Sequence, residues 1–179
     1  MKKYNTIFLD RDGTINPDPG YISSLDQFEF YDFTFSSLKR LSRDGYRFCI
    51  ITNQSGVSRG LIKQKDLDNI HEYIKNQFMK NSIPLLGIYI AIDHPSSATI
   101  RRKPGVGMFL EASKDHHINL KDSLIIGDSI NDIQAGKDLE MDTILVRTGR
   151  GNQTILDYPD LRPDAIVSNI EEAADWILK

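Results

Sequence analysis

Two aspartates near the start of the chain stand in a setting that suits phosphate chemistry. Asp10 and Asp12 follow the short apolar run 6–9, and Gly13 comes directly after them. Successive side chains of a strand point to opposite sides, so two carboxylates that share a site must lie where the strand breaks into a loop. Carboxylates bind Mg²⁺, act as nucleophiles and transfer protons. The alternative interpretation is an ordinary turn rich in Asp and Gly.

Polar segments also follow three other apolar runs. Residues 52–56, 93–104 and 127–132 each come directly after such a run, and each contains hydroxyl, amide or charged side chains. In a parallel sheet these strand ends open on one edge, which is where ligands bind in open α/β folds. We therefore expect the four segments to converge on one site.

The apolar runs alternate with stretches of helical periodicity. The predicted strands cover residues 6–9, 48–51, 88–92, 124–126, 143–146 and 165–167. Phe35, Leu38 and Leu41 recur at helical spacing, and Gly45 offers a helix stop. The other predicted helices cover 67–78, the stretch after Pro104, 130–139 and 170–178. In the helix after Pro104 we expect one face to hold Val106, Phe109, Leu110 and Ser113. This alternation predicts an α/β fold, with a Rossmann-like parallel sheet and helices on both faces.

Composition indicates a soluble globular protein. The 179 residues suit a single domain over 1–179, with 40% hydrophobic and 26% charged residues. A net charge of −3 gives no electrostatic reason to expect nucleic acid or a membrane as partner. Cys49 is the one cysteine and lies in an apolar run, so we expect a buried core residue. With no apolar stretch suited to a leader at residues 1–5, we expect a cytoplasmic protein, and a monomer.

The motifs, in their order, resemble those of the haloacid dehalogenase superfamily of phosphotransferases. The residues that carry the resemblance are Asp10-Arg11-Asp12-Gly13-Thr14, Thr52, Lys103, Gly127-Asp128 and Asp132. The resemblance implies a magnesium-dependent hydrolase with one phosphatase domain. The short loops after the strands leave no room for a separate cap domain.

Within the superfamily the chain is similar to the heptose bisphosphate phosphatases of the histidinol-phosphatase-like subfamily. Residues 10–16, 52–60, 102–104 and 146–149 carry this similarity. It implies a small-molecule phosphosugar substrate, D-glycero-D-manno-heptose 1,7-bisphosphate. The implied reaction removes its 7-phosphate during the synthesis of nucleotide-activated heptose for lipopolysaccharide and other surface glycans.

The catalytic roles follow from the chemistry of phosphate esters. We expect Asp10 to be the nucleophile, because it ends the strand and is rigidly held, and Asp12 to transfer protons. The predicted Mg²⁺ ligands are the Asp10 carboxylate, the Asp12 backbone carbonyl and Asp128. Thr52 and Lys103 are expected to contact the transferring phosphoryl group. The supporting residue Asp132 is expected to orient the loop or Lys103.

The expected substrate contacts come from the resemblance. They are Asp18, Gly20, Tyr21, Thr52, Asn53, Gln54, Ser55, Arg59, Arg102 and Lys103. Arg102 is expected to bind the second phosphate, since a guanidinium grips phosphate oxygens in pairs, and Arg59 is another candidate. Arg147 and Arg150 are expected to be solvated, and His71 to be a surface or packing residue.

One segment departs from the family. The family commonly holds a structural zinc with Cys-x-His and Cys-x-Cys just before Arg-Lys-Pro. The corresponding residues here are Ala91-Ile92-Asp93 and Thr99-Ile100-Arg101. Without thiolates a closed tetrahedral zinc site is not available, so we expect no zinc.

Three other interpretations remain open. The chain could be a histidinol-phosphate phosphatase, or a phosphatase for another small phosphomonoester in the same superfamily. It could be a phospho-receiver module, although the acceptor Asp of those modules follows the third strand. It could also be a phosphosugar-binding protein without activity.

Overall fold

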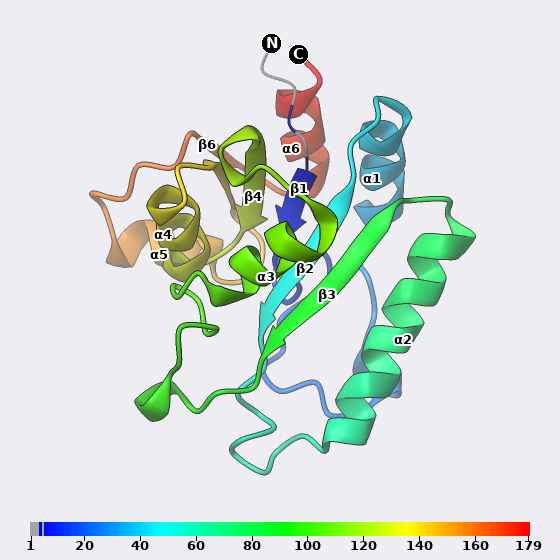
Figure 1. Ribbon diagram of the computed structural model, residues 1–179, viewed down its shortest axis with the longest axis vertical. Helices are drawn as coiled ribbons and strands as arrows, with labels where there is room; N and C mark the ends of the chain where they lie inside the picture. The colour runs from blue at the N-terminus through cyan, green and yellow to red at the C-terminus, as the bar shows by residue number, and fades with distance from the viewer. Residues whose placement is uncertain (1–3, 5) are drawn as a thin grey trace.

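The computed structural model describes residue 4 and residues 6–179 (Figure 1). Residues 1–3 and 5 lie outside this range, and so does the predicted passage from the N-terminal residues into the first strand. Among the described residues, no helix combines the length and the apolar character that crossing a membrane requires.

Six parallel strands form one sheet in the order β3-β2-β1-β4-β5-β6. They are β1 (Thr6–Leu9), β2 (Phe48–Asn53), β3 (Leu85–Ala91), β4 (Ser123–Gly127), β5 (Asp142–Val146) and β6 (Ala165–Val167). The strand order reverses between β1 and β4, which are hydrogen-bonded neighbours. At such a point the connections leave in opposite directions, and a crevice opens at the carboxyl ends of the strands.

Helices cover both faces of the sheet (Figure 1). They are α1 (Thr34–Arg43), α2 (Gln64–Lys80), α3 (Gly107–His116), α4 (Ile130–Asp138), α5 (Gly151–Asp157) and α6 (Ile170–Ile177), with short 3₁₀ turns η1 (Leu25–Gln27), η2 (Pro95–Ser97) and η3 (Leu120–Asp122). Buried side chains of α1, α2 and α6 pack with Ile7, Leu9 and Ile50 in one core. Those of α3 and α4 pack with Phe8 and Cys49 in the other. The alternation along β1 therefore divides its side chains between two cores.

The structure confirms the predicted fold class, with a few local differences. Cys49 is buried, and burial raises the pKa of its thiol to about 12. The face predicted for α3 is wrong at Leu110, which is 48% exposed. The buried face instead holds Met108, Phe109 and Ala112, which pack on Phe8 and Cys49. Helix α5 is not predicted, because its seven residues, Gly151–Asp157, carry no apolar repeat.

Candidate active site

A cavity of about 250 Å³ opens at the carboxyl ends of the strands. Its walls come from the loops after β1, β2, β3 and β4, the four segments expected to converge. The predicted residues on its walls are Asp10, Asp12, Asp18, Gly20, Tyr21, Thr52, Asn53, Gln54, Ser55, Arg102, Lys103 and Asp128. Because these segments are far apart in the chain, the sheet itself assembles the cavity.

Lys103 ties the floor of the cavity together. Its Nζ donates to Asp10 Oδ1 at 2.8 Å, to Asp132 Oδ1 at 2.6 Å and to the Ile51 carbonyl at 2.7 Å. Burial alone would lower the pKa of Lys103, but Asp10 and Asp132 outweigh it and raise the pKa above its ordinary value. The ammonium is therefore charged and fully hydrogen-bonded, as a buried cation must be.

Asn53 holds the backbone that carries Lys103. The Lys103 N–H donates to Asn53 Oδ1 at 3.0 Å, and Asn53 Nδ2 donates to the Lys103 carbonyl at 3.0 Å. This two-way bond joins the end of β2 to the loop after β3. The expected substrate contact Asn53 lines the cavity, but its amide is used in this bond.

Asp10 and Asp128 form the acidic part of the cavity. Burial and the nearby Asp132 raise the pKa of Asp10 to about 7, although Lys103 acts against this shift. Burial, Asp10 and Asp132 raise the pKa of Asp128 to about 8. The Arg150 N–H donates to Asp128 Oδ2 at 2.7 Å. Burial and the neighbouring carboxylates therefore raise both pKa values more than the nearby donors lower them.

Two glycines enclose the Asp128 carboxylate. A Cβ built on Gly13 would lie 2.0 Å from Asp128 Oδ2, and one on Gly149 would lie 2.1 Å from the same atom. Both glycines have positive φ, 83° and 55°. No larger residue fits at either position, so the loops after β1 and β5 can close on Asp128 only with glycine there.

Both carboxylate oxygens of Asp132 accept hydrogen bonds from other groups of the protein. Its Oδ2 accepts from the Ser129 N–H at 3.1 Å and from Ser129 Oγ at 2.6 Å, a capping box at the start of α4. Its other oxygen accepts from Lys103. Asp132 therefore positions α4 and Lys103, in the manner expected for a supporting residue.

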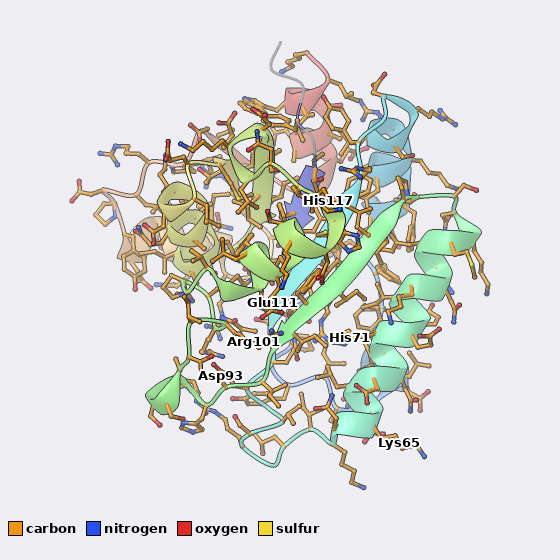
Figure 2. All side chains as sticks on the ribbon, in the orientation of Figure 1. Lys65, His71, Asp93, Arg101, Glu111 and His117 are labelled. Atoms are coloured by element: carbon orange, nitrogen blue, oxygen red, sulfur yellow. The ribbon has the colours of Figure 1, made fainter. Side chains whose placement is uncertain are left out.

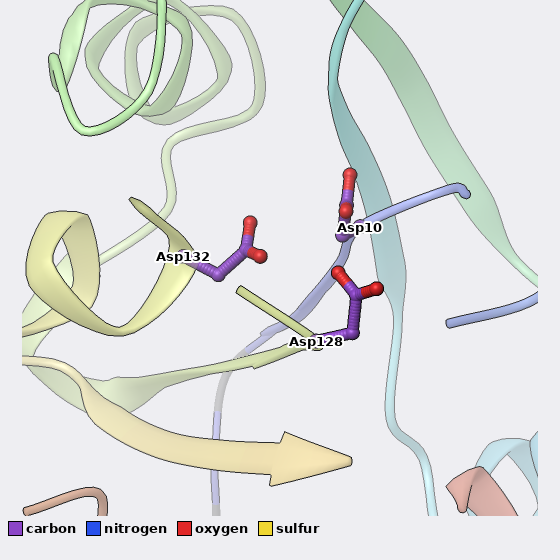
Figure 3. Close-up of side chains that lie close together, drawn as sticks. All are labelled: Asp10, Asp128 and Asp132. Carbon is purple, nitrogen blue, oxygen red and sulfur yellow. The ribbon is translucent and has the colours of Figure 1, made fainter. Parts of the chain in front are cut away.

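The acidic residues fit a divalent cation. Asp10, Asp128 and Asp132 each offer an oxygen, and these atoms lie within 4.8 Å of one another (Figure 3). Because Asp132 already accepts from Lys103 and Ser129, Asp10 and Asp128 are the carboxylates left to hold the ion. Hard oxygen ligands are those that Mg²⁺ prefers, and its charge would relieve the repulsion between them.

Asp12 lies in a different environment. Its Oδ1 accepts from Arg11 Nε at 3.0 Å and Asn16 Nδ2 at 2.9 Å, and its Oδ2 from Arg11 Nη2 at 2.8 Å and Gln54 Nε2 at 2.7 Å. Burial alone would raise the pKa of Asp12, but Arg11, followed by Asn16 and Gln54, lowers it below the ordinary value. The carboxylate is therefore ionised and held from both sides.

The arginines near the opening differ in how far they enter the cavity. Arg102 lines the cavity, and burial lowers its pKa, with the charge on Asp93 acting against this shift. Arg59 is exposed and is not among the residues that line the cavity. Arg150, expected to be solvated, lines the cavity and forms an ion pair with Asp18 at 3.5 Å, although its side chain is 75% exposed.

The sequence interpretation missed other residues as well. Gly56 lines the cavity after β2, and Ser129 and Asn131 line it from the start of α4. Arg11 holds Asp12, and His71 contacts Arg11 at 3.0 Å. The signal for His71 was its place on the apolar side of α2, three residues before Ile74. The signal for Arg11 was a charged residue directly after a buried strand.

Comparison with known proteins gives the family. Residues 100–173 match a family model described as HAD-hydrolase-like. The D-glycero-beta-D-manno-heptose-1,7-bisphosphate 7-phosphatase of Escherichia coli O6:H1 is 35% identical over 99% of this chain and 90% of its own length. That of Helicobacter pylori is 36% identical, over 96% of this chain and 95% of its own. The chain belongs to this phosphatase family.

Solved structures of heptose bisphosphate phosphatases share the fold. The D,D-heptose 1,7-bisphosphate phosphatase from B. bronchiseptica, complexed with magnesium and phosphate, aligns with a TM-score of 0.88 and 27% identity. The alignment covers 97% of this chain and 98% of that one. The Burkholderia thailandensis enzyme aligns with a TM-score of 0.73 and 26% identity, over 98% and 99% of the two chains.

In this member of the heptose bisphosphate phosphatase family, side chains hold the segment expected to lack zinc. Asp93 Oδ2 accepts from the Thr99 N–H at 2.7 Å and from Thr99 Oγ1 at 2.5 Å. Arg101 forms an ion pair with Glu111 of α3 and donates to the Ile90 carbonyl at 2.9 Å (Figure 2). These contacts connect the loop to β3 and α3. The absence of zinc stays a prediction, which metal analysis of the purified protein would test.

Proposed function

We propose that this protein is a magnesium-dependent phosphatase that removes the 7-phosphate of D-glycero-β-D-manno-heptose 1,7-bisphosphate. The whole chain, 1–179, is proposed as one phosphatase domain. Asp10 carries the proposal, because it directly follows β1, lines the cavity, and lies beside the Lys103 ammonium and the Asp128 carboxylate. The β anomer comes from the names of the relatives that match over nearly the whole chain.

In the first step the Asp10 carboxylate attacks the phosphorus of the 7-phosphate. The new bond joins Asp10 to phosphorus, and the bond from phosphorus to the sugar oxygen breaks with its electron pair on oxygen. That oxygen takes a proton from Asp12, which must enter this step protonated although its neighbours favour the ionised form. Dividing hydrolysis between two steps gives each a lower barrier.

In the second step water attacks the aspartyl-phosphate and passes a proton to Asp12. Phosphate leaves and the Asp10 carboxylate is restored. The strong donors around Asp12 favour its ionised form, which is the form that accepts this proton.

Lys103 and Thr52 are proposed to contact the transferring phosphoryl group. The Lys103 ammonium lies 2.8 Å from Asp10 and places positive charge beside the oxygens that gain charge in the transition state. Thr52 Oγ1 accepts from Gln54 Nε2 at 2.9 Å, so its own proton can be donated to an oxygen in the cavity.

Mg²⁺ is proposed to be held by the Asp10 and Asp128 carboxylates and the Asp12 carbonyl. When bound, it offsets the repulsion between an anionic nucleophile and an anionic phosphate. Asp132 keeps its role in orienting Lys103.

The second phosphate is proposed to bind at the cavity opening. Arg102 lines this part of the cavity together with Asp18, Gly20 and Tyr21, while Asn53, Gln54 and Ser55 line the β2 side. Arg59 is a weaker candidate, because its side chain is exposed outside the cavity. The Arg102→Lys variant should raise KM for the bisphosphate more than KM for a monophosphate, since it loses the paired guanidinium donors.

A substrate panel tests the function. Phosphate release is measured with Mg²⁺ for both anomers of heptose 1,7-bisphosphate, for histidinol phosphate and for fructose 1,6-bisphosphate, with Asp10→Asn as the blank. Preference for the β heptose anomer supports the proposal. Preference for histidinol phosphate would replace the substrate, and the absence of turnover with all four would contradict the phosphatase function itself.

The position of the acidic pair in the chain argues against a receiver module. Asp10 and Asp12 follow β1, the first described strand of the chain, whereas a receiver carries its acceptor Asp after the third strand. The monomeric state, the cytoplasmic location and the lack of nucleic-acid or membrane partners stay predictions. Size-exclusion chromatography with light scattering would test the first.

A further inference from the structure

Arg11 occupies an unusual position for an arginine. It is the largest fully buried side chain among the described residues, 1% exposed, and it lies between the two aspartates of the first loop. A buried guanidinium costs free energy unless all its donors are used and its charge is paired. Nothing in the proposed mechanism yet requires a cation at this place.

The guanidinium grips Asp12 on both oxygens. Arg11 Nε donates to Oδ1 at 3.0 Å and Nη2 to Oδ2 at 2.8 Å, a paired contact between two planar groups. Such a contact fixes the plane and the direction of the carboxylate as well as its distance. Arg11 Cζ also lies over the Phe28 ring, 5.9 Å from its centre, within the range of a cation–π contact.

His71 holds the remaining part of the guanidinium. It comes from α2, sixty positions further along the chain, and its Nε2 lies 3.0 Å from Arg11 Nη1 inside the protein. Figure 2 shows His71 on the side of α2 that faces the sheet. Arginine can only donate, so Nε2 must accept and the ring must be neutral, with its proton on Nδ1.

The rest of the imidazole supports this interpretation. Nδ1 is buried without a hydrogen-bond partner in the described part of the chain. The hydrogen bond between Nε2 and Arg11 therefore sets the orientation of the ring. Burial, and then the charge on Arg11, lowers the pKa of His71 to about 3, so the ring stays neutral at working pH. His71 does not line the cavity, so it acts only through Arg11.

We propose that Arg11 and His71 are positioning residues for proton transfer: His71 fixes the guanidinium, and the guanidinium fixes the Asp12 carboxylate. The proposal rests on the proposed function, in which Asp12 gives a proton to the sugar oxygen and later takes one from water. A carboxylate that turns by a small angle misses the leaving oxygen, and a misplacement of about 1 Å can cost a hundredfold in rate.

The choice of leaving group separates positioning from general damage. When the leaving group is a sugar oxygen, it needs the proton of Asp12 as its bond to phosphorus breaks. When it is p-nitrophenolate, the anion leaves without a proton, so the first step does not need Asp12. The second step needs Asp12 with both substrates, because the water that attacks the aspartyl-phosphate must lose a proton.

Two substitutions at one position make a matched pair. His71→Gln keeps a carbonyl that can accept from Arg11, whereas His71→Phe keeps the ring volume and removes the acceptor. Arg11→Lys keeps the charge and loses the paired donors. Ile74→Ala, one turn along α2, serves as a control that loosens the same helix without touching Arg11. If Arg11→Lys fails to fold, the His71 pair still gives the answer.

The expected result has two parts. With heptose bisphosphate, kcat of His71→Phe and of Arg11→Lys falls by about 10- to 100-fold, while KM changes by less than about threefold. With p-nitrophenyl phosphate, the same variants release about one equivalent of p-nitrophenol per site rapidly and then turn over slowly. His71→Gln and Ile74→Ala stay within about threefold of the wild type on both substrates.

Other results overturn the proposal. They are an unchanged kcat in His71→Phe, equal losses in His71→Phe and His71→Gln, or equal losses on both substrates without a rapid first phase. The proposed function fails separately, when the wild type hydrolyses no phosphate ester or when Asp10→Asn retains turnover.

Discussion

Asp10 and Asp12 are two residues apart in the chain, yet their carboxylates meet different neighbours. Asp12 accepts four hydrogen bonds from Arg11, Asn16 and Gln54, and its pKa is lowered. Asp10 shares its side of the cavity with Asp128, and the pKa of each is raised, to about 7 and about 8. The Asp12 side is electrostatically complete without a ligand, whereas the Asp10 side needs positive charge from outside.

This difference indicates a division of labour. The Asp10 side, which lacks positive charge, suits a group that binds a cation and a phosphate, because the cation offsets the negative charge of both the carboxylates and the phosphate. The Asp12 side, where the carboxylate already has its donors, suits a group that must keep its orientation while it gives and takes protons. Substitutions on the two sides should therefore differ in kind, and the following experiments test whether they do.

The largest effect is expected for Asp10→Asn. Loss of the nucleophile should lower turnover by more than about a thousandfold, while an amide of the same shape leaves the fold intact. Phosphate release measures the first part and thermal melting the second. Substantial turnover in a folded variant would remove Asp10 from its assigned role.

Asp12→Asn is expected to destabilise the protein. The variant leaves the buried Arg11 guanidinium without its counter-charge, which should lower the free energy of unfolding by about 3 kcal/mol. Urea unfolding in EDTA measures this effect. An unchanged unfolding midpoint would mean that water or another group reaches Arg11 and that the Asp12 side is not closed.

His71 should make the protein sensitive to acid. Its pKa is about 3 in the folded chain and about 6.5 in the unfolded chain, so below pH 6.5 the unfolded state binds the extra proton. Stability should fall by about 2 kcal/mol between pH 7 and pH 5 through this group. His71→Gln should lack that part of the loss. If the free energy of unfolding falls equally in both proteins between pH 7 and pH 5, the ring is not buried in its neutral form.

Asp128→Asn should stabilise the metal-free protein at pH 7, by about 1 kcal/mol, because it removes a carboxyl group whose charge is disfavoured by burial and by Asp10 and Asp132. The raised pKa values mean that the folded state binds more protons than the unfolded state between about pH 4 and pH 8, so their stability cost grows as pH rises through that range. At pH 5 the gain should be smaller than at pH 7, since both carboxyl groups are protonated in the folded state there and only the cost of protonating them remains. Mg²⁺ should raise the melting temperature of the wild type but not of this variant. If the variant is less stable than the wild type at pH 7, the Asp10 side does not lack positive charge.

The smallest effect is expected far from both sides. The ion pair between Arg40 of α1 and Asp175 of α6 is about half exposed, so Arg40→Ala should cost less than about 1 kcal/mol. Turnover should not change. A large loss of activity in this variant would show that effects spread through the whole fold and that the comparison of the two sides is not local.

The sequence predicts the strands well because each is a short apolar run followed by a polar loop. The residues that end up in the cavity were predictable for the same reason, since parallel strands end on one edge. It does not predict which groups meet inside the loops. His71 reaches Arg11 only because α2 packs beside the first loop, although the two residues are sixty positions apart in the chain. Arg11 and Asn16 are close to Asp12 in sequence, but the fold of the loop decides that their side chains turn onto its carboxylate.

Arg150 and α5 show a second limit. A short polar helix such as α5 has too few apolar residues for a periodic signal. Arg150 contacts Asp128 through its backbone N–H, and a backbone contact depends on the path of the loop rather than on the residue type.

Lys103 also bears on how the protein folds. Its Nζ joins groups that are 93, 52 and 29 positions away in the chain. Contacts this distant in sequence require large loops to close first, which slows folding. During refolding, enzymatic activity should therefore return later than helical signal, and its rate would report when the strands at the centre of the sheet have come together.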